Sequence, residues 1–321
     1  MDTTQLTETV QQPFSWPTSQ PPHPMNLTTA SKMCTTLILK NPSIETAVTH
    51  FNTGFSSNDV IQVSANRHKY IVKIPRQPTT SPNAAATCKA EAMRTAWAAR
   101  CGFGPQVLCI DPETGAFAME RLRGHTLTAA DLVQQQRLPQ IVRLLLRIHT
   151  APPAKWMWRY DPMNSVTTML EAVKRTHAIM APTEVRLIEE IVSRTKEMVK
   201  EHPWVLCHND FHSHNIFLQQ PVAAGGYPEH LMAIDFEECD LGDPMWDLAY
   251  LIVNLELEHH PYRLADLYGT TSHERVRVGA YIPLALAHCA TWAALRGGPW
   301  VQHYKELMER LDKLKPEREG P

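Results

Sequence analysis

The spacing of the apolar residues changes part-way along the chain, and this change constrains the fold most. Before Gly124, short runs rich in β-branched residues predict strands, at 47–51, 60–63, 70–74, 107–110 and 116–121. One alanine-rich segment among them, 85–101, predicts a helix that stops at Gly102. After Gly124 the apolar residues recur at helical spacing, as in Leu138, Ile141 and Leu145. The chain is therefore expected to be α+β and to have two parts.

These two parts predict a two-lobed architecture. A small N-terminal lobe of five antiparallel strands and one helix is expected at 34–124, and a larger, mainly helical lobe at 125–321. Residues 1–33 are rich in Thr, Gln, Pro and Ser, and they predict a disordered tail. Further helices of the second lobe are predicted at 183–200, 246–258, 272–295 and 299–314. Short apolar runs between the helices predict small strands that present a site, at 204–207, 216–218 and 231–234.

Composition excludes several classes of protein. The 321 residues include only 13 glycines, and neither G-x-G-x-x-G nor G-x-x-x-x-G-K-S/T occurs. A Rossmann dinucleotide fold and a P-loop NTPase are therefore not expected. The formal net charge is −2, so there is no electrostatic reason to expect nucleic acid or an anionic membrane as a partner.

The cysteines and the termini predict a compartment. The seven cysteines include no C-x-x-C pair, which indicates reduced thiols in a cytoplasmic protein. The N-terminus lacks the charged-then-apolar pattern of a secretion signal. The uncharged stretch 278–295 has the length of a membrane span, but Pro283, His288 and several alanines lower its hydropathy. It predicts a buried helix and no membrane insertion.

One segment carries the strongest chemical signal. His208, Asp210 and Asn215 have the form H-x-D-x-x-x-x-N between two predicted strands, and a second acidic cluster follows at Asp235 and Glu237. Phosphoryl transfer needs Mg²⁺ to neutralise developing charge, and the oxygens of these acids and of Asn215 suit that ion. The accepting hydroxyl needs a carboxylate that orients it and takes its proton, a role that suits Asp210.

The first lobe supplies the other half of this chemistry. Lys73 lies in a predicted strand, where its ammonium group could reach the α- and β-phosphates of ATP. Glu91 lies in the predicted helix that follows and could hold that lysine by an ion pair. Each of the two residues is common alone, but their order and context are specific.

Over about 45–295 these residues resemble the choline/ethanolamine kinase family, within the wider aminoglycoside-phosphotransferase-like kinases. Seven segments carry the resemblance. In the first lobe they correspond to the family's phosphate loop (51–58), lysine strand (70–75), turn after the lobe helix (102–105) and adenine hinge (119–124). In the second lobe they correspond to its catalytic loop (207–217), metal loop (234–237) and following helix (242–248). The resemblance implies that Asp210 is the catalytic acid/base, that Asn215 and Asp235 hold Mg²⁺, and that Asp247 braces the catalytic loop with His208. It also implies that ATP lies against further residues of the first lobe: Ser56, Asn58, Glu120 and Leu122.

The acceptor is predicted to be small. Only seven residues separate Asp235 from Asp243, which leaves no room for a segment that would hold a peptide. An amino alcohol such as choline or ethanolamine needs aromatic faces and carboxylates around its ammonium group. The candidates are Glu237, Trp246, Tyr250, Glu256 and Trp292. The sequence departs from the eukaryotic choline-kinase pattern at Glu238 and Asn254, so the acceptor stays open.

Several alternatives remain at this stage. The acceptor could be thiamine, an aminoglycoside or a sugar. A non-catalytic kinase-like binding protein and a metal-dependent hydrolase are alternative functions, although Lys73, Asp210, Asn215 and Asp235 are all present. The three histidines 208, 212 and 214 could also be a metal cluster, and the tryptophans could be core residues. The oligomeric state is not predicted.

Overall fold

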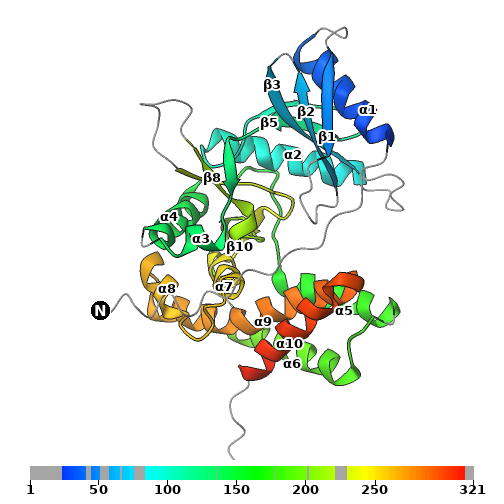
Figure 1. Ribbon diagram of the computed structural model, residues 1–321. Helices are drawn as coiled ribbons and strands as arrows, with labels where there is room; N and C mark the ends of the chain where they lie inside the picture. Colours follow the sequence, from blue (N-terminus) through cyan, green and yellow to red (C-terminus); the bar gives the residue numbers. More distant parts are fainter. Residues whose placement is uncertain are drawn as a thin grey trace, which may run out of the picture. The chain divides into compact units, whose positions relative to one another are not determined.

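The computed structural model of the protein describes residues 24–40, 45–50, 58–65, 67–75, 84–134, 136–176, 178–200, 202–220 and 230–314 (Figure 1). The chain divides into two compact units. The sheet unit comprises residues 15–127 and 214–239. The described residues of the helical unit lie within 128–213 and 240–314.

A five-stranded antiparallel sheet forms the body of the sheet unit, in the order β1-β2-β3-β5-β4. Its strands are β1 (Thr46–His50), β2 (Asn58–Ala65), β3 (His68–Pro75), β4 (Val107–Ile110) and β5 (Phe117–Glu120). Helix α2 (Ala84–Arg100) lies between β3 and β4 in the chain. The predicted order of three strands, one helix and two strands is confirmed, and the strand pairing is antiparallel as expected.

Side chains alternate between the two faces of the sheet, and both faces are buried. On one face, residues such as Val63 and Val72 pack with Ala30 and Cys34. On the other face, Phe117 of β5 packs with Cys88 and Ala92 of α2. Successive side chains of a strand point to opposite faces, so Lys73, next to Val72, points to the face that α2 covers.

The segment before β1 forms a helix in the structure, although the sequence predicts a disordered tail through residue 33. Helix α1 (Pro24–Lys32) continues into a π-helical segment, Met33–Ile38. Asn26 of α1 donates a 2.8 Å hydrogen bond to Asp59 of β2, and Ala30 is buried against the sheet. Tertiary contacts therefore order a segment whose own composition does not favour a helix. Residues 1–23 lie outside the described residues.

A second, three-stranded sheet completes the sheet unit. Its antiparallel order is β6-β8-β9, formed by β6 (Gly124–Thr126), β8 (Ile216–Gln219) and β9 (His230–Ala233). Gly124 has φ +135°, and a Cβ there would lie 1.9 Å from the Leu218 carbonyl oxygen. Only glycine fits this position, because the neighbouring strand approaches the backbone so closely.

The helical unit is built around α9. Its helices are α3 (Ala129–Leu132), α4 (Arg137–Thr150), α5 (Pro162–Thr176), α6 (Pro182–Met198), α7 (Pro244–Asn254), α8 (Tyr262–Tyr268), α9 (Ser272–Arg296) and α10 (Val301–Lys313). Helix α9 packs against α5, α6, α7 and α10 (Figure 1). Strands β7 (Val205–Cys207) and β10 (Asp240–Gly242) pair antiparallel. Among the described residues, α9 is the one helix long and apolar enough to cross a membrane, and 67% of its most apolar stretch is buried in the protein. This burial matches the predicted buried helix.

Candidate active site

In the sheet unit, Lys73 joins two carboxylates. Its ammonium group donates to Glu91 of α2, and its Nζ lies 2.8 Å from Asp235 Oδ1. Lys73 and Glu91 are almost fully buried, with 5% and 1% of their surface exposed. Asn58, the first residue of β2, donates a 2.9 Å hydrogen bond to the second oxygen of Glu91. Glu91 is thus held from two strands, and it fixes the direction of the Lys73 side chain.

The β8–β9 pair brings Asn215 and Asp235 to the same end of the small sheet. Asn215 immediately precedes β8, and Ile234 after β9 donates a 2.9 Å hydrogen bond to its carbonyl oxygen. Asp235 has φ +65°, an unusual value for a residue other than glycine. This strained turn directs its carboxylate to Lys73.

A third carboxylate lies beside the two that bind Lys73. Oxygens of Glu91, Asp235 and Glu237 lie within 4.8 Å of one another. The loop that carries Glu237 is held to α2, since Arg94 donates a 2.7 Å hydrogen bond to the Glu237 carbonyl oxygen. Carboxylate oxygens are the ligands that Mg²⁺ prefers. This donor set therefore fits a hard divalent cation.

The charge balance of the cluster favours such a cation. Burial opposes the charge of Lys73, but Asp235 and Glu91 outweigh it and hold the pKa of the ammonium group above its usual range. Burial raises the pKa of Glu91; Lys73 opposes this rise, and Asp235 and Glu237 add to it. One lysine thus faces three acids, and a second positive charge would stabilise their ionised forms.

In the helical unit, Asp247 holds the backbone of the loop that carries Asp210. Its two oxygens accept 2.7 Å hydrogen bonds from the backbone N–H groups of His208 and Asn209. Asn209 has φ +63°, and its carbonyl oxygen accepts a 3.2 Å hydrogen bond from the Trp246 indole. The residue before Asp210 is therefore fixed in an unfavourable conformation by two residues of α7.

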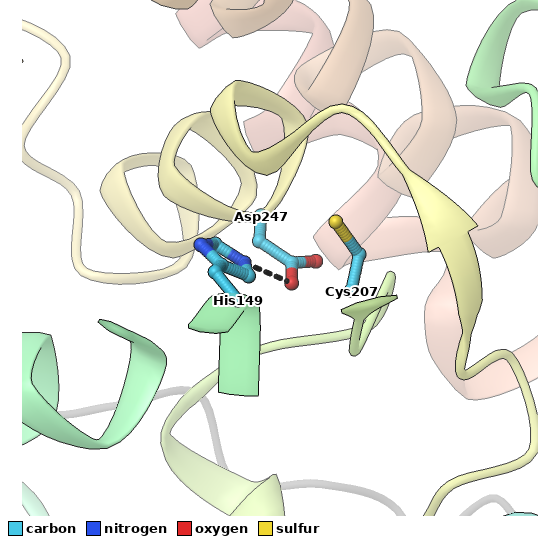
Figure 2. Close-up of side chains that lie close together, drawn as sticks. All are labelled: His149, Cys207 and Asp247. Atoms are coloured by element: carbon cyan, nitrogen blue, oxygen red, sulfur yellow. Dashed lines mark hydrogen bonds and ion pairs between the residues drawn. The ribbon is translucent and has the colours of Figure 1, made fainter. Parts of the chain in front are cut away.

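His149 and Tyr268 extend this support. His149 Nε2 lies 3.0 Å from Asp247 Oδ2, and its Nδ1 lies 2.7 Å from the Tyr268 hydroxyl. Figure 2 shows His149 of α4 and Asp247 of α7 pointing toward each other, with Cys207 beside them. A carboxylate only accepts, so Nε2–H donates to Asp247, and in a neutral ring Nδ1 then accepts from Tyr268. His149, Cys207 and Asp247 are residue types that bind metals, but both oxygens of Asp247 already accept backbone N–H groups. These contacts therefore hold the loop that carries Asp210.

Asp210 itself lies among groups that favour its ionised form. Its side chain is 34% exposed, and Oδ2 lies 3.5 Å from His212 Nε2. Burial raises the pKa of Asp210, but His212, His208 and the Tyr250 hydroxyl outweigh this effect and hold the pKa well below its usual range. Asp210 is therefore a carboxylate over the whole neutral pH range.

An aromatic cluster lies next to Asp210. The Tyr250 ring lies 5.4 Å from Trp246, 5.7 Å from His288 and 6.3 Å from His212, measured between centroids. Burial lowers the pKa of His288 to about 4, although Asp210 opposes this shift. The Tyr250 and His288 rings beside Asp210 are therefore uncharged at neutral pH.

The remaining predicted residues have other surroundings. Trp246 is fully buried and has no surface to offer a substrate, because it packs into the core and supports Asn209. Glu256 is exposed and lies 3.8 Å from Arg310, and Trp292 packs edge-on against Trp300 at 4.8 Å. Glu120 ends β5 and accepts a 3.0 Å hydrogen bond from the Gln106 N–H.

Leu122 and Ser56 were predicted to contact ATP, and histidines 208, 212 and 214 were an alternative metal cluster. Leu122 is buried, with 8% of its surface exposed, and Ser56 lies outside the described residues. Within the described ranges, histidines 208, 212 and 214 do not form a metal-ligating group.

Sequence reasoning missed His149, Tyr268 and His288, and the one functional role that it considered for His212 was that of a metal ligand. His212 is only 15% exposed and faces Asp210 and Tyr250. The spacing H-x-D-x-H could have indicated His212. His149 and Tyr268 are 119 residues apart, and no local pattern connects them.

A family model described as "Phosphotransferase enzyme family" matches residues 48–278. The chain belongs to this family. Protein LicA of Haemophilus influenzae is 24% identical to this phosphotransferase over 207 residues, which cover 63% of the chain and 72% of that LicA. The matched part spans 57% of a second LicA sequence from the same species.

Solved structures share the fold of the phosphotransferase. Choline kinase LicA from Streptococcus pneumoniae has a TM-score of 0.68 at 18% identity, over 90% of this chain and 99% of that chain. The GDP complex of aminoglycoside 2'-phosphotransferase-IIIa has a TM-score of 0.63 at 15% identity, over 90% of this chain and 99% of that chain. The family model confirms the predicted phosphotransferase enzyme class and the wider family, and the solved structures confirm the kinase-like fold class.

Proposed function

We propose that the protein is an ATP- and Mg²⁺-dependent kinase that transfers the γ-phosphate to the hydroxyl of a small amino alcohol of the choline or ethanolamine type. The observation that carries the proposal is the Lys73 cluster. A buried lysine held by Glu91 and facing Asp235 is the arrangement that phosphoryl transfer needs in its nucleotide half.

In the nucleotide half, the Lys73 ammonium group binds α- and β-phosphate oxygens of ATP, and Glu91 keeps it in place. Asn58 supports Glu91 from β2. Asp235 and Asn215, with Glu237, would supply oxygen ligands for Mg²⁺, and the ion would neutralise charge on the phosphoryl group. Asp235 also pairs with Lys73, so a cation on Asp235 would share this carboxylate with the ammonium group.

In the acceptor half, Asp210 orients the hydroxyl and takes its proton. Its low pKa makes it a weak base before the reaction, so it acts chiefly by positioning, and the proton moves as the oxygen–phosphorus bond forms. Asp247, Trp246 and His149 hold the loop in place. Such positioning accounts for a large part of the rate in phosphoryl transfer.

The surroundings of Asp210 favour a cationic acceptor. Tyr250 offers an aromatic ring, Asp210 a negative charge, and His288 a neutral ring that does not repel a cation. An ammonium group is attracted to this combination. The relatives named LicA include a choline kinase, which agrees with this acceptor class. The seven cysteines are all free, and we place the enzyme in the reducing cytoplasm on that ground.

The second candidate is the same reaction on an aminoglycoside, because an aminoglycoside phosphotransferase shares the fold. Thiamine and sugars complete the set of acceptors to test, and a non-catalytic binding protein is the alternative without chemistry.

A transfer assay with ATP and Mg²⁺ over choline, ethanolamine, thiamine, aminoglycosides and simple sugars tests the proposal. We expect phosphorylation of an amino alcohol. If only aminoglycosides were phosphorylated, the assignment of an amino alcohol as acceptor would be wrong. Phosphate release in a control with ATP and no acceptor would indicate a hydrolase.

A further inference from the structure

The helical unit contains a cavity that the catalytic residues do not line. Its volume is about 580 Å³, within the range of small-molecule sites. It lies where α5 begins and α6 ends, two helices that pack side by side in Figure 1. Tyr281 and Asp243 also line it, from α9 and from the residue before α7. The residues next to Asp210, namely His212, Tyr250 and His288, are not among its lining residues.

The cavity presents opposite charges from its two helices. Lys196 lines it from the last turn of α6, and Lys200 lines it from two residues beyond the end of that helix. Neither lysine side chain has an ion-pair or hydrogen-bond partner among the described residues. Asp161 lines it from the start of α5. Its Oδ1 accepts the Met163 N–H at 2.9 Å, and no described residue binds its Oδ2. Two ammonium groups at one helix and a carboxylate at the other fit a ligand that carries both charges.

Aromatic residues complement the carboxylate. Tyr160, which precedes Asp161 in the chain, lines the cavity and supplies the aromatic ring, whereas Tyr281 is fully buried in the cavity wall. Glu197 lines the cavity from α6 beside Lys196, so Lys196, Lys200 and Glu197 together give the α6 end a formal charge of +1. Aromatic rings and carboxylates together attract an alkylammonium group, whereas paired lysines bind phosphate. The chemistry of the cavity therefore matches a small molecule with a phosphate at one end and an amine at the other.

We propose that this cavity is an effector site for a phosphorylated amino alcohol, bound with its phosphate on Lys196 and Lys200 and its ammonium group near Asp161 and Tyr160. Such a zwitterion is the product class of the proposed kinase reaction, so this inference rests on the proposed function. It assigns a second, regulatory site for the product, apart from Asp210.

The cavity lining is connected to the support of the catalytic loop. Asp243 caps α7 through a 3.0 Å hydrogen bond from the Met245 N–H, and Arg277 of α9 holds its carboxylate at 3.0 and 3.2 Å. The Tyr281 ring packs edge-on against Trp246 at 5.8 Å. Trp246 and Asp247 of α7 hold the residues before Asp210. Asp243 and Tyr281 are buried behind the cavity surface, so a ligand bound there would act through the packing around them, bias the position of α7 and lower turnover.

Product inhibition distinguishes this site from the active site. Phosphocholine or O-phosphoethanolamine bound at Asp210 competes with the acceptor, so saturating acceptor removes that inhibition. Product bound in the cavity inhibits at saturating acceptor. We expect the unaltered protein to show this inhibition that saturating acceptor does not remove. In the double variant Lys196→Ala/Lys200→Ala its inhibition constant should rise about ten-fold or more. Lys305→Ala, an exposed lysine of α10, is the matched control and should change nothing.

A second variant tests the amine end of the site. Asp161→Asn keeps a side-chain oxygen for the cap of α5 but loses the charge, so it should weaken the binding of phosphocholine and leave that of inorganic phosphate unchanged. Purely competitive inhibition, or equal inhibition in the double variant and the unaltered protein, would overturn the proposal. Inhibition by inorganic phosphate as strong as that by phosphocholine would overturn the claim that the site recognises an ammonium group as well as a phosphate.

This test fails separately from the proposed function. If no amino alcohol is a substrate, the proposed function is wrong, but calorimetry with phosphocholine still reports on the cavity. Binding that depends on Lys196 and Lys200 would then support the site, and its absence would overturn it.

Discussion

Replacing His149 with alanine tests whether the brace behind the catalytic loop sets the position of Asp210. His149 donates to Asp247, whose carboxylate is fully buried and also accepts two backbone N–H groups. A hydrogen bond to a charged group contributes about 1.5–3 kcal/mol. The ring of His149 is itself buried, so its loss also leaves a cavity. We expect the free energy of unfolding to fall by about 3 kcal/mol.

The effect on catalysis is expected to exceed what a loss of folded protein explains. Asp247 keeps its two backbone partners in His149→Ala, but its side chain is freer to move, and Asn209 is then less firmly held at φ +63°. A small displacement of Asp210 costs about 10- to 100-fold in rate. We therefore expect kcat to fall by this factor while KM for ATP stays the same, because the Lys73 cluster is untouched.

Tyr268→Phe is the matched control for this experiment. It removes only the hydroxyl that binds His149 Nδ1, and a neutral hydrogen bond contributes about 1 kcal/mol. Denaturant unfolding and steady-state kinetics on both variants give the comparison. A His149→Ala protein that is less stable but has an unchanged kcat would refute the positioning role and leave only a structural one.

Three further predictions concern other parts of the protein. Lys73→Met leaves three carboxylates without their lysine and should lower the free energy of unfolding by about 3 kcal/mol at pH 7; equal stability in urea would contradict the ion-pair account. Asp210 has a lowered pKa in the folded state, so its stabilising effect is complete above the unfolded pKa of about 4 and is lost as pH falls through the folded value. The difference in free energy of unfolding between the unaltered protein and Asp210→Asn should therefore shrink below about pH 4. A difference that grows there would show that folding raises the pKa of Asp210. Gly124→Ala should cost at least about 2 kcal/mol, because its Cβ would lie 1.9 Å from the Leu218 oxygen; a thermal melt with unchanged Tm would show that β6 can move.

The sequence predicted the parts of the fold that periodicity encodes. Strands β1 to β5, helix α2 and the long helices α6, α7, α9 and α10 follow apolar spacing, and they lie near their predicted ranges. The sequence did not predict α1, α3, α5 and α8. Helix α1 forms through contacts with the sheet, such as Asn26 with Asp59, and local propensity does not record such contacts.

The candidate site shows the same division. Residues of the motif around Asp210 and the pair of Lys73 and Glu91 could be found because their types and order are specific to phosphoryl transfer. His149 could not be found, because its contact with Asp247 joins residues 98 positions apart. Trp246 has the residue type of a cation site, but its burial depends on the packing of α7 and α9, which sequence spacing does not give.

The central claim is that Asp210 positions the accepting hydroxyl while a separate group of residues binds ATP. Asp210→Asn keeps the size of the side chain and removes its charge. Single-turnover transfer from radiolabelled ATP to the best amino alcohol, together with the Kd for ATP, measures both halves in one protein. We predict a loss of most of the transfer rate with a nearly unchanged Kd for ATP. A transfer rate equal to that of the unaltered protein would contradict the mechanism.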